Sequence, residues 1–309
     1  MYNFWVLFSL ISLFFASIFT KQSLADEQLF GYIQSAETIP QGGKQFYQWV
    51  THRAGRSQGS FNAQDYRTEF EYGITDRLQG SLYVNARSFY IKDSAPIEDG
   101  SPTYPNRNDG IRLDGFSAAL KYNVLSPFIP NKFGGIGMAL YVEPGYSTVF
   151  NVTGEPMYSP FIETKIVFQK NFLEDRLVTV FNIENDFVKR KFKDGDDLWQ
   201  NDIELNLYAG ASYLVHSNWY AGFETRYHSE YPQTSDVSSI STMPRYGFRQ
   251  QHVAWVGPNV HYTTKKWWLT LTWLAQVGGN ATNNDGIAGN LYLVDHERNE
   301  LRAKIAYNF

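Results

Sequence analysis

Apolar and polar residues alternate one by one along most of the chain beyond residue 43. In residues 66–74, Phe70 and Tyr72 fall on one face, while Glu69 and Glu71 fall on the opposite face. Successive side chains of a β-strand point to opposite sides, so this alternation predicts a strand with one apolar and one charged face. The same pattern recurs in segment after segment down to the C-terminus, which predicts a protein built of strands alone.

The connections between these segments alternate between short and long. A tight turn at Thr75-Asp76-Arg77 joins two alternating segments into a hairpin. Further short connections are expected at 126–132, 170–175, 215–218 and 263–266, and long ones at 55–64, 91–112, 150–159, 188–200, 229–249 and 278–297. Bacterial outer-membrane barrels have short periplasmic turns and longer outer loops. The predicted fold is therefore all-β, a transmembrane antiparallel up-and-down β-barrel of about 12 strands, placed in the bacterial outer membrane.

An export signal is expected at the N-terminus. Residues 4–19 are almost wholly apolar but too short for a comfortable membrane-spanning helix, and a small-x-small site favours cleavage between Ala25 and Asp26. No Lys or Arg precedes this run, so an uncleaved signal anchor is the alternative. The expected organisation is a signal peptide over residues 1–25, a periplasmic N-terminal segment over 26–43 and an outer-membrane barrel over 44–309. Residues 28–43 could form a tail, an extra strand or a short plug that enters the barrel from below.

The composition agrees with a barrel. The mean hydropathy of −0.37 is low because only every second residue of a barrel strand needs to be apolar. The 21 Tyr, 23 Phe and 8 Trp exceed the needs of an ordinary core, and Tyr and Trp suit a water–lipid boundary. Cysteine is absent, so something other than disulfides must hold the fold, and a closed hydrogen-bonded barrel would do so. The net charge of −4 gives no support for a nucleic-acid partner.

The last strand carries an assembly signal. Ile305, Tyr307 and Phe309 share one face, and Phe309 is the final residue. This end resembles the C-terminal strand of bacterial outer-membrane barrels that the barrel-assembly machinery recognises. The resemblance implies that machinery as a partner, with outer-membrane lipid and lipopolysaccharide as the surroundings of the folded barrel.

Three short segments carry a wider family resemblance: residues 71–78, 256–262 and 37–40. They resemble segments of a broad group of uncharacterised outer-membrane barrels, which includes a domain-of-unknown-function family and barrels associated with phenol-degradation operons. The resemblance spans most of the chain beyond the signal. The shared segments consist largely of residues that form turns, so the resemblance implies the fold more than it implies an activity.

The face opposite the apolar one is rich in charge and is expected to line the lumen. The candidate lumen residues are Arg67, Glu69, Glu71, Arg87, Lys121, Glu143, Glu163, Lys165, Glu204, Glu224, Arg226, His228, Arg302 and Lys304, with Glu184 on the same face. Unpaired ions away from water are costly, so these groups must be paired, hydrated or both. A polar conduit with charged selectivity elements and an interior filled with ion pairs are both compatible with this pattern, since a barrel of about 12 strands has an intermediate width.

The turn at 215–218 allows a register prediction. A simple hairpin there would place Glu204 opposite His228, Asn206 opposite Arg226, and Tyr208 opposite Glu224. Glu204 would then also reach Arg226 diagonally. We expect this cluster in the outer half of the lumen, as either a solute contact or a structural ion-pair network.

No catalytic or metal motif is evident. Some outer-membrane barrels of similar size hydrolyse lipids with a Ser and a His on the lipid-facing wall, and His228 and Ser229 invite that comparison. The alternation points His228 inward, however, and no Gly-x-Ser-x-Gly or His-Glu-x-x-His motif is present. We therefore expect no enzyme activity, no cofactor and no metal. The expected function is a channel or facilitated-uptake protein for small polar or amphipathic solutes. The alternatives are a closed-lumen barrel with a structural or surface-binding role, for which the polar loops 91–112 and 229–249 would serve, and an outer-membrane lipid hydrolase.

Overall fold

The structure, a computed structural model, describes residues 29–93, 106–194, 198–233, 249–282 and 287–309. No helix in these ranges is long and apolar enough to cross a membrane. The expected cleavage site at Ala25 and Asp26 lies outside the described residues, as do large parts of the loops 91–112 and 229–249.

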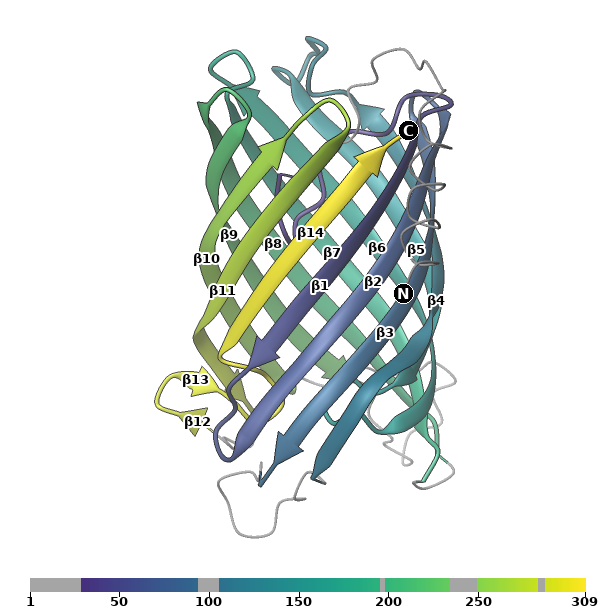
Figure 1. The fold of residues 1–309 in the computed structure, drawn as a ribbon, viewed down its shortest axis with the longest axis vertical. Helices are drawn as coiled ribbons and strands as arrows, with labels where there is room; N and C mark the ends of the chain where they lie inside the picture. Colours follow the sequence, from purple (N-terminus) through teal and green to yellow (C-terminus); the bar gives the residue numbers. More distant parts are fainter. Residues whose placement is uncertain (1–28, 94–105, 195–197, 234–248, 283–286) are drawn as a thin grey trace, which may run out of the picture.

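The chain forms a single closed barrel (Figure 1). Its strands are β1 (Lys44–Ala54), β2 (Ser60–Thr75), β3 (Leu78–Lys92), β4 (Arg107–Leu125), β5 (Ile136–Val149), β6 (Pro156–Phe172), β7 (Leu177–Phe192), β8 (Gln200–His216), β9 (Trp219–Pro232), β10 (Gln251–Thr263), β11 (Trp267–Ala281) and β14 (Asn299–Asn308). Each strand pairs with its antiparallel neighbours, and β1 closes the ring against β14. The prediction of a closed antiparallel barrel of about 12 strands is confirmed.

Two further strands, β12 (Ile287–Ala288) and β13 (Leu291–Tyr292), form a small ribbon in the connection between β11 and β14. The chain then turns into the mouth of the barrel, where Tyr292, Leu293 and Val294 are buried. Val294 and Tyr292 pack against Trp255 on the inner wall. This connection therefore forms part of the lumen wall at the end with the long loops.

The alternation of residues separates the two faces of the wall. Apolar side chains such as Leu82, which is 63% exposed, and Ile305, which is 53% exposed, cover the outside. Charged side chains on the same strands are buried inside, with Glu69 and Glu143 among them. An apolar outer surface on a protein with a polar interior is the arrangement of a transmembrane barrel.

The register between β8 and β9 differs from the prediction. Asn206, and not Glu204, lies opposite His228, and Tyr208 lies opposite Arg226. The turn is tighter than expected: His216 pairs with Trp219, and Ser217 adopts a positive φ of 41°. The pairing moves by two residues, which keeps every side chain on its face because the strand repeat is two residues. The expected contact between Glu204 and Arg226 is therefore wrong.

Residues 29–39 lie inside the barrel, in the half of the lumen nearest the short turns, and residues 40–43 lead from there to β1 at the barrel end (Figure 1). They are neither an external tail nor an additional strand, and we call them the plug. Phe30 and Ile33 are buried against Val180 and Tyr208 of the inner wall. Burial of a large apolar side chain contributes about 1.5–3 kcal/mol, so these residues hold the plug against the wall.

Candidate functional site

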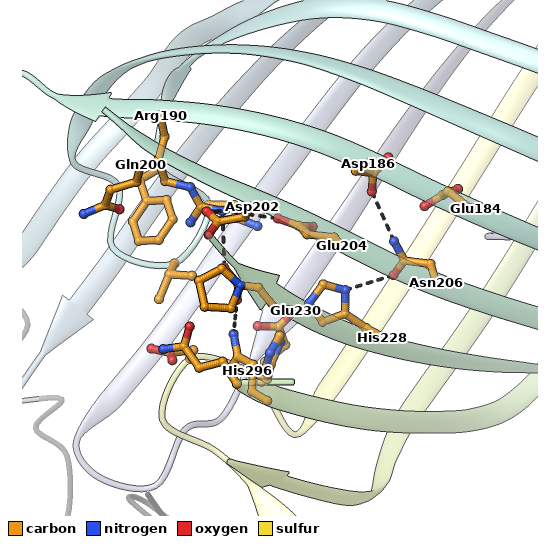
Figure 2. Close-up of a pocket in the computed structure, with 18 of the residues that line it drawn as sticks. Glu184, Asp186, Arg190, Gln200, Asp202, Glu204, Asn206, His228, Glu230 and His296 are labelled. Carbon is orange, nitrogen blue, oxygen red and sulfur yellow. Dashed lines mark hydrogen bonds and ion pairs between the residues drawn. The ribbon is translucent and has the colours of Figure 1, made fainter. Parts of the chain in front are cut away.

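A large polar chamber occupies the lumen on the side of the long loops. Its volume is about 850 Å³, within the range of pockets that bind small molecules. Its wall comes mainly from β7, β8 and β9, together with β1–β3 and the inward-folded connection that precedes β14. We call this space the outer chamber; Figure 2 shows part of its lining.

Ion pairs hold most of the charged residues of the chamber. Arg53 contacts Asp65 at 2.8 Å, and Arg226 contacts Glu300 at 3.1 Å. Arg190 contacts three carboxylates: Asp202 at 2.8 Å, Glu204 at 3.3 Å and Glu230 at 3.4 Å (Figure 2). Such networks fix the side chains that line the lumen, because a buried charge without a partner is strongly unfavourable.

Five carboxylates lie side by side across five consecutive strands. Glu143 on β5 is opposite Glu163 on β6, which is opposite Asp186 on β7; Asp186 is opposite Glu204 on β8, and Glu204 is opposite Glu230 on β9. We call these residues the acidic row. Like charges directly opposite each other are destabilising, so the row requires cations beside it.

The protein supplies cations to four members of the row. Arg67 contacts Glu143 at 2.6 Å, Lys165 contacts Glu163 at 2.6 Å, and Arg190 contacts Glu204 and Glu230. Among the described residues, no Lys or Arg forms an ion pair with the fifth member, Asp186. Its Oδ2 accepts a hydrogen bond of 3.1 Å from the amide of Asn206.

A smaller cavity of about 150 Å³ lies between the outer chamber and the plug. Its wall shares Glu184, Tyr208, Arg226 and Arg302 with the outer chamber. Aromatic rings and charged groups alternate around it, and the guanidinium of Arg302 stacks 4.0 Å from the ring of Trp49. We call this space the inner cavity.

The aromatic residues are not confined to the expected water–lipid boundary. Tyr47, Tyr83, Tyr141 and Tyr208 are buried inside the barrel, where they line the inner cavity. The hydroxyl groups of Tyr83 and Tyr141 lie 3.1 Å apart, and the Tyr141 hydroxyl also donates to Glu143. The high Tyr content thus serves the lumen as well as the outer surface.

The plug is anchored through its backbone. Glu224, fully buried on β9, accepts hydrogen bonds from the amides of Gly31 at 2.6 Å and Tyr32 at 2.9 Å, and it also accepts from Asn259 and Thr272. Further side chains of the wall bond to plug amides or carbonyls: Asn182, Gln169, Gln79, Asn123, Asn259, Arg302 and Lys304. Wall residues from many strands therefore take the place of a ladder partner for the plug backbone.

Two titratable groups in the connection before β14 have shifted pKa values. Burial raises the pKa of Glu297 to about 7, against the opposing effect of Arg53, whose Nη1 lies 3.4 Å away. Burial lowers the pKa of His296, and the nearby His228 and arginines add to the effect. The charge of this part of the chamber wall therefore changes close to neutral pH.

The structure places the expected lumen residues on the inner face. Those that line the outer chamber or the inner cavity are Arg67, Glu69, Arg87, Glu143, Glu163, Lys165, Glu204, Arg226, His228, Arg302 and Lys304. The others, Glu71, Lys121 and Glu224, are buried without lining either space. The sequence did not single out Asp186, Arg190, Asp202 and Glu230, although the same alternation places them on this face.

The adjacent His228 and Ser229 do not form a pair. Nδ1 of His228 lies 2.9 Å from the side-chain oxygen of Asn206, and the Ser229 hydroxyl donates to the carbonyl of Leu205 at 3.3 Å. The two side chains point to opposite faces of β9, because they are successive residues of a strand. The expectation that the protein is not an enzyme stays a prediction.

Glu163, Glu184 and Asp186 offer three carboxylate oxygens within 4.8 Å of one another. The ammonium of Lys165 contacts two of these residues, Glu163 at 2.6 Å and Glu184 at 2.7 Å. A protein cation therefore already neutralises part of this group, and the expectation of no metal stays a prediction.

Solved structures with similar folds are bacterial outer-membrane barrels. The COG4313 outer membrane channel from Pseudomonas putida F1 is 12% identical with a TM-score of 0.52, over 89% of this chain and 98% of that chain. The β domain of the Bordetella autotransporter BrkA is 10% identical with a TM-score of 0.49, over 87% of this chain and 100% of that chain. LpxR from Salmonella typhimurium is 8% identical with a TM-score of 0.44, over 86% of this chain and 100% of that chain.

At these identities the likeness concerns the fold alone, and only the first of the three TM-scores exceeds 0.5. No protein of curated function matches the sequence. The expected resemblance to a barrel family of unknown function is confirmed by a family model that matches residues 22–309. The chain belongs to the family of unknown function DUF6662.

Proposed function

We propose that this barrel is a channel for the uptake of small polar solutes across the bacterial outer membrane, closed at rest by the plug. A solute would enter the outer chamber from the side of the long loops. It would then pass the inner cavity and leave beside the displaced plug. The charged residues of the wall would select among solutes.

The observation that carries this proposal is that the two spaces are adjacent. The outer chamber and the inner cavity share four wall residues, and the inner cavity reaches Gly31 and Tyr32 of the plug. Two polar spaces therefore lie one after the other between the long loops and the plug, separated by side chains that line both. A barrel packed throughout with paired side chains would not have a chamber of about 850 Å³.

The way in which the plug is held supports a movable element. Its central contacts converge on Glu224, and individual hydrogen bonds contribute only about 0.5–1.5 kcal/mol each. The plug residues at the barrel end make few backbone contacts with the wall, such as that between Gly42 and Gly73 at 2.8 Å. Inside the lumen the plug is held by wall side chains and is not a strand of the ladder, so it can leave the lumen without opening the strand ladder. The cost is set by all of these hydrogen bonds and by the burial of Phe30 and Ile33.

The test is the conductance of the purified barrel in planar lipid bilayers. We expect brief, infrequent openings of the wild-type protein and a several-fold higher open fraction for Glu224→Gln, because an amide cannot accept hydrogen bonds from all the donors around Glu224. Asp114→Asn is the matched control. Asp114 is a buried carboxylate on β4 that lines neither space, and within the described residues it forms no hydrogen bond with the plug. It bonds to Ser147 and to Arg87 of the outer chamber, so the control perturbs the chamber wall without touching the plug.

The plug also favours a second function, a closed barrel whose outer chamber binds a solute without passing it on. The two functions differ in the behaviour of Glu224→Gln. A folded variant that stays silent, with the wild type equally silent, would contradict the channel and favour the closed binding barrel.

A further inference from the structure

The outer chamber has an excess of negative charge. Nine carboxylates and five arginines line it, while no lysine does: Asp65, Glu184, Asp186, Asp202, Glu204, Glu230, Asp295, Glu297 and Glu300, against Arg53, Arg87, Arg190, Arg226 and Arg302. A cleft lined by one sign of charge concentrates ions of the opposite sign. The chamber as a whole is therefore suited to cations.

Within the acidic row, Asp186 carries the negative charge that no Lys or Arg of the described chain neutralises. It lies between Glu163 and Glu204, whose cations are Lys165 and Arg190. Its Oδ1 is buried and has no hydrogen-bond partner in the described part of the chain. Since buried polar atoms are almost always hydrogen-bonded, this oxygen calls for a donor from outside the chain.

A second acceptor at the end of the row points the same way. Gln251 on β10 lies opposite Glu230, only 7% of its surface is exposed, and its amide donates to Glu230. Its Oε1 lines the outer chamber without a hydrogen-bond partner. Both of these atoms are acceptors, so a group that fills them must donate hydrogen bonds. Nε of Arg190 and Nε of Arg226 are donors in the same chamber without a hydrogen-bond partner among the described residues, but both guanidinium groups already hold carboxylates.

The side chains that neutralise other members of the row, Lys165 and Arg190, are nitrogen cations with several N–H donors. The carboxylates of this wall therefore bind cations of that chemical type. Lys165 Nζ lies between two carboxylates at 2.6 and 2.7 Å, and Arg190 contacts three. An alkylammonium has the same three donors as lysine. A chamber of about 850 Å³ also has room for the carbon skeleton that such a group carries.

We propose that the outer chamber binds small organic cations through an ammonium group placed at Asp186, between the ammonium of Lys165 and the guanidinium of Arg190. The inference rests on the proposed function, for which it names the class of solute. The acidic row also gives the bound cation a direction. Asp186, Glu204 and Glu230 line the outer chamber, while Glu163 and Glu143 line the inner cavity. Neighbouring strands lie about 4.8 Å apart, so a cation could pass from one carboxylate to the next in short steps.

The test is isothermal titration calorimetry of the purified full-length barrel in detergent, at low salt and near pH 7. The probe is butane-1,4-diammonium, and the comparison solutes are butane-1,4-diol, succinate and Mg²⁺. We expect saturable binding of the diammonium that weakens as salt rises, and no binding of the diol or succinate. Mg²⁺ binding as tight as that of the diammonium would overturn the organic class, and succinate binding would overturn the charge preference.

Variants locate the site. Asp186→Asn should weaken diammonium binding about tenfold, which is the usual cost of losing a hydrogen bond to a charged group. Asp175→Asn makes the same change in an exposed turn at the opposite end of β7 and should leave binding unchanged. Equal binding by wild type and Asp186→Asn, with both variants folded, would overturn the assignment of Asp186.

The readout is independent of conduction. Diammonium binding that depends on Asp186 in a barrel that never conducts would retain the cation site and overturn the channel. Conduction by Glu224→Gln without any diammonium binding would do the reverse.

Discussion

Asp186 on β7 and Glu204 on β8 lie directly opposite each other on the inner wall, and only Glu204 has an arginine beside it. Two like charges in this position destabilise the folded barrel, and the pair stands in the middle of a row of carboxylates. The stability of the barrel and the chemistry of its lumen therefore depend on the same residues.

Asp186→Asn should stabilise the folded barrel. The substitution removes one of two opposed charges and keeps the shape of the side chain, so we expect a gain of about 0.5 kcal/mol. Thermal unfolding in detergent, followed by the electrophoretic shift between folded and unfolded barrel, measures it. Glu174→Gln, in an exposed turn, is the control. A loss of stability would show that Asp186 has a cationic partner in the folded protein.

Arg190→Met should destabilise the barrel strongly. Asp202, Glu204 and Glu230 would be left without their shared cation, and breaking a buried ion-pair network costs about 3–5 kcal/mol. Chemical denaturation of refolded protein gives the difference, with Arg77→Met in an exposed turn as the control. A loss below about 1 kcal/mol, typical of an exposed pair, would mean that water screens this cluster.

Gly31→Ala should displace the plug. A Cβ at this position would lie 2.5 Å from Oγ1 and 2.7 Å from Cβ of Thr272, too close for any normal contact. We expect faster proteolysis within the plug and a higher open fraction in bilayers. Gly278→Ala on the same strand as Thr272 is the matched control, because a Cβ there meets no atom within 4 Å. Unchanged proteolysis would place the plug further from β11.

Stability should fall between about pH 5 and pH 8 because of Glu297. Its pKa of about 7 in the folded state lies above the ordinary 4.5, so its contribution is fully present below about pH 4.5 and is lost as pH rises through 7. The upper limit is about 3–4 kcal/mol, at 1.36 kcal/mol for each pKa unit.

Glu297→Gln should flatten this part of the pH profile of the thermal unfolding midpoint. Arg53 and Arg56 favour the ionised form of Glu297, while Glu300 favours the protonated form, and all three remain in the variant. A profile that keeps its slope in Glu297→Gln would assign the titration to another group.

Phe309→Ala should reduce assembly in cells without reducing stability. Ile305 is exposed on the outer face of β14, and Phe309, one residue beyond the strand, is also exposed and packs edge-on against Tyr307 at 5.2 Å between ring centroids. Truncation of this exposed ring removes little buried surface, so the folded barrel should keep its stability. We expect less folded barrel in the membrane fraction but normal refolding in detergent. Equal losses in both would indicate a structural role in place of recognition by the assembly machinery.

The fold could be predicted because apolar and polar residues alternate with the two-residue repeat of a strand, as at Phe70 and Glu71. The register could not, since it depends on a two-residue turn at Ser217 that alternation does not reveal. Arg190 lay in a stretch that was predicted to be a loop. Where β7 extends beyond the membrane, its outward side chains no longer need to be apolar, so the alternation of apolar and polar residues that identifies a membrane strand is missing there.

The position of the plug had no signal in the sequence. Its amides bond to side chains far apart in the chain, Gln79, Asn182 and Glu224 among them, and any polar residue of the lumen could have met this need. The acidic row is likewise invisible in the sequence, because its five members become neighbours only once every register from β5 to β9 is fixed.

The strand that closes the ring also carries the plug. β1 pairs with β14 from Gln45 to Ala54, and residues 29–43 continue from its first residue back into the lumen. Through Phe30 and Gly31 the plug also bonds to Lys304 and Arg302 on β14. The seam of the ring and the plug are therefore one connected structure, and a change that separates β1 from β14 would also strain the contacts between the plug and β14.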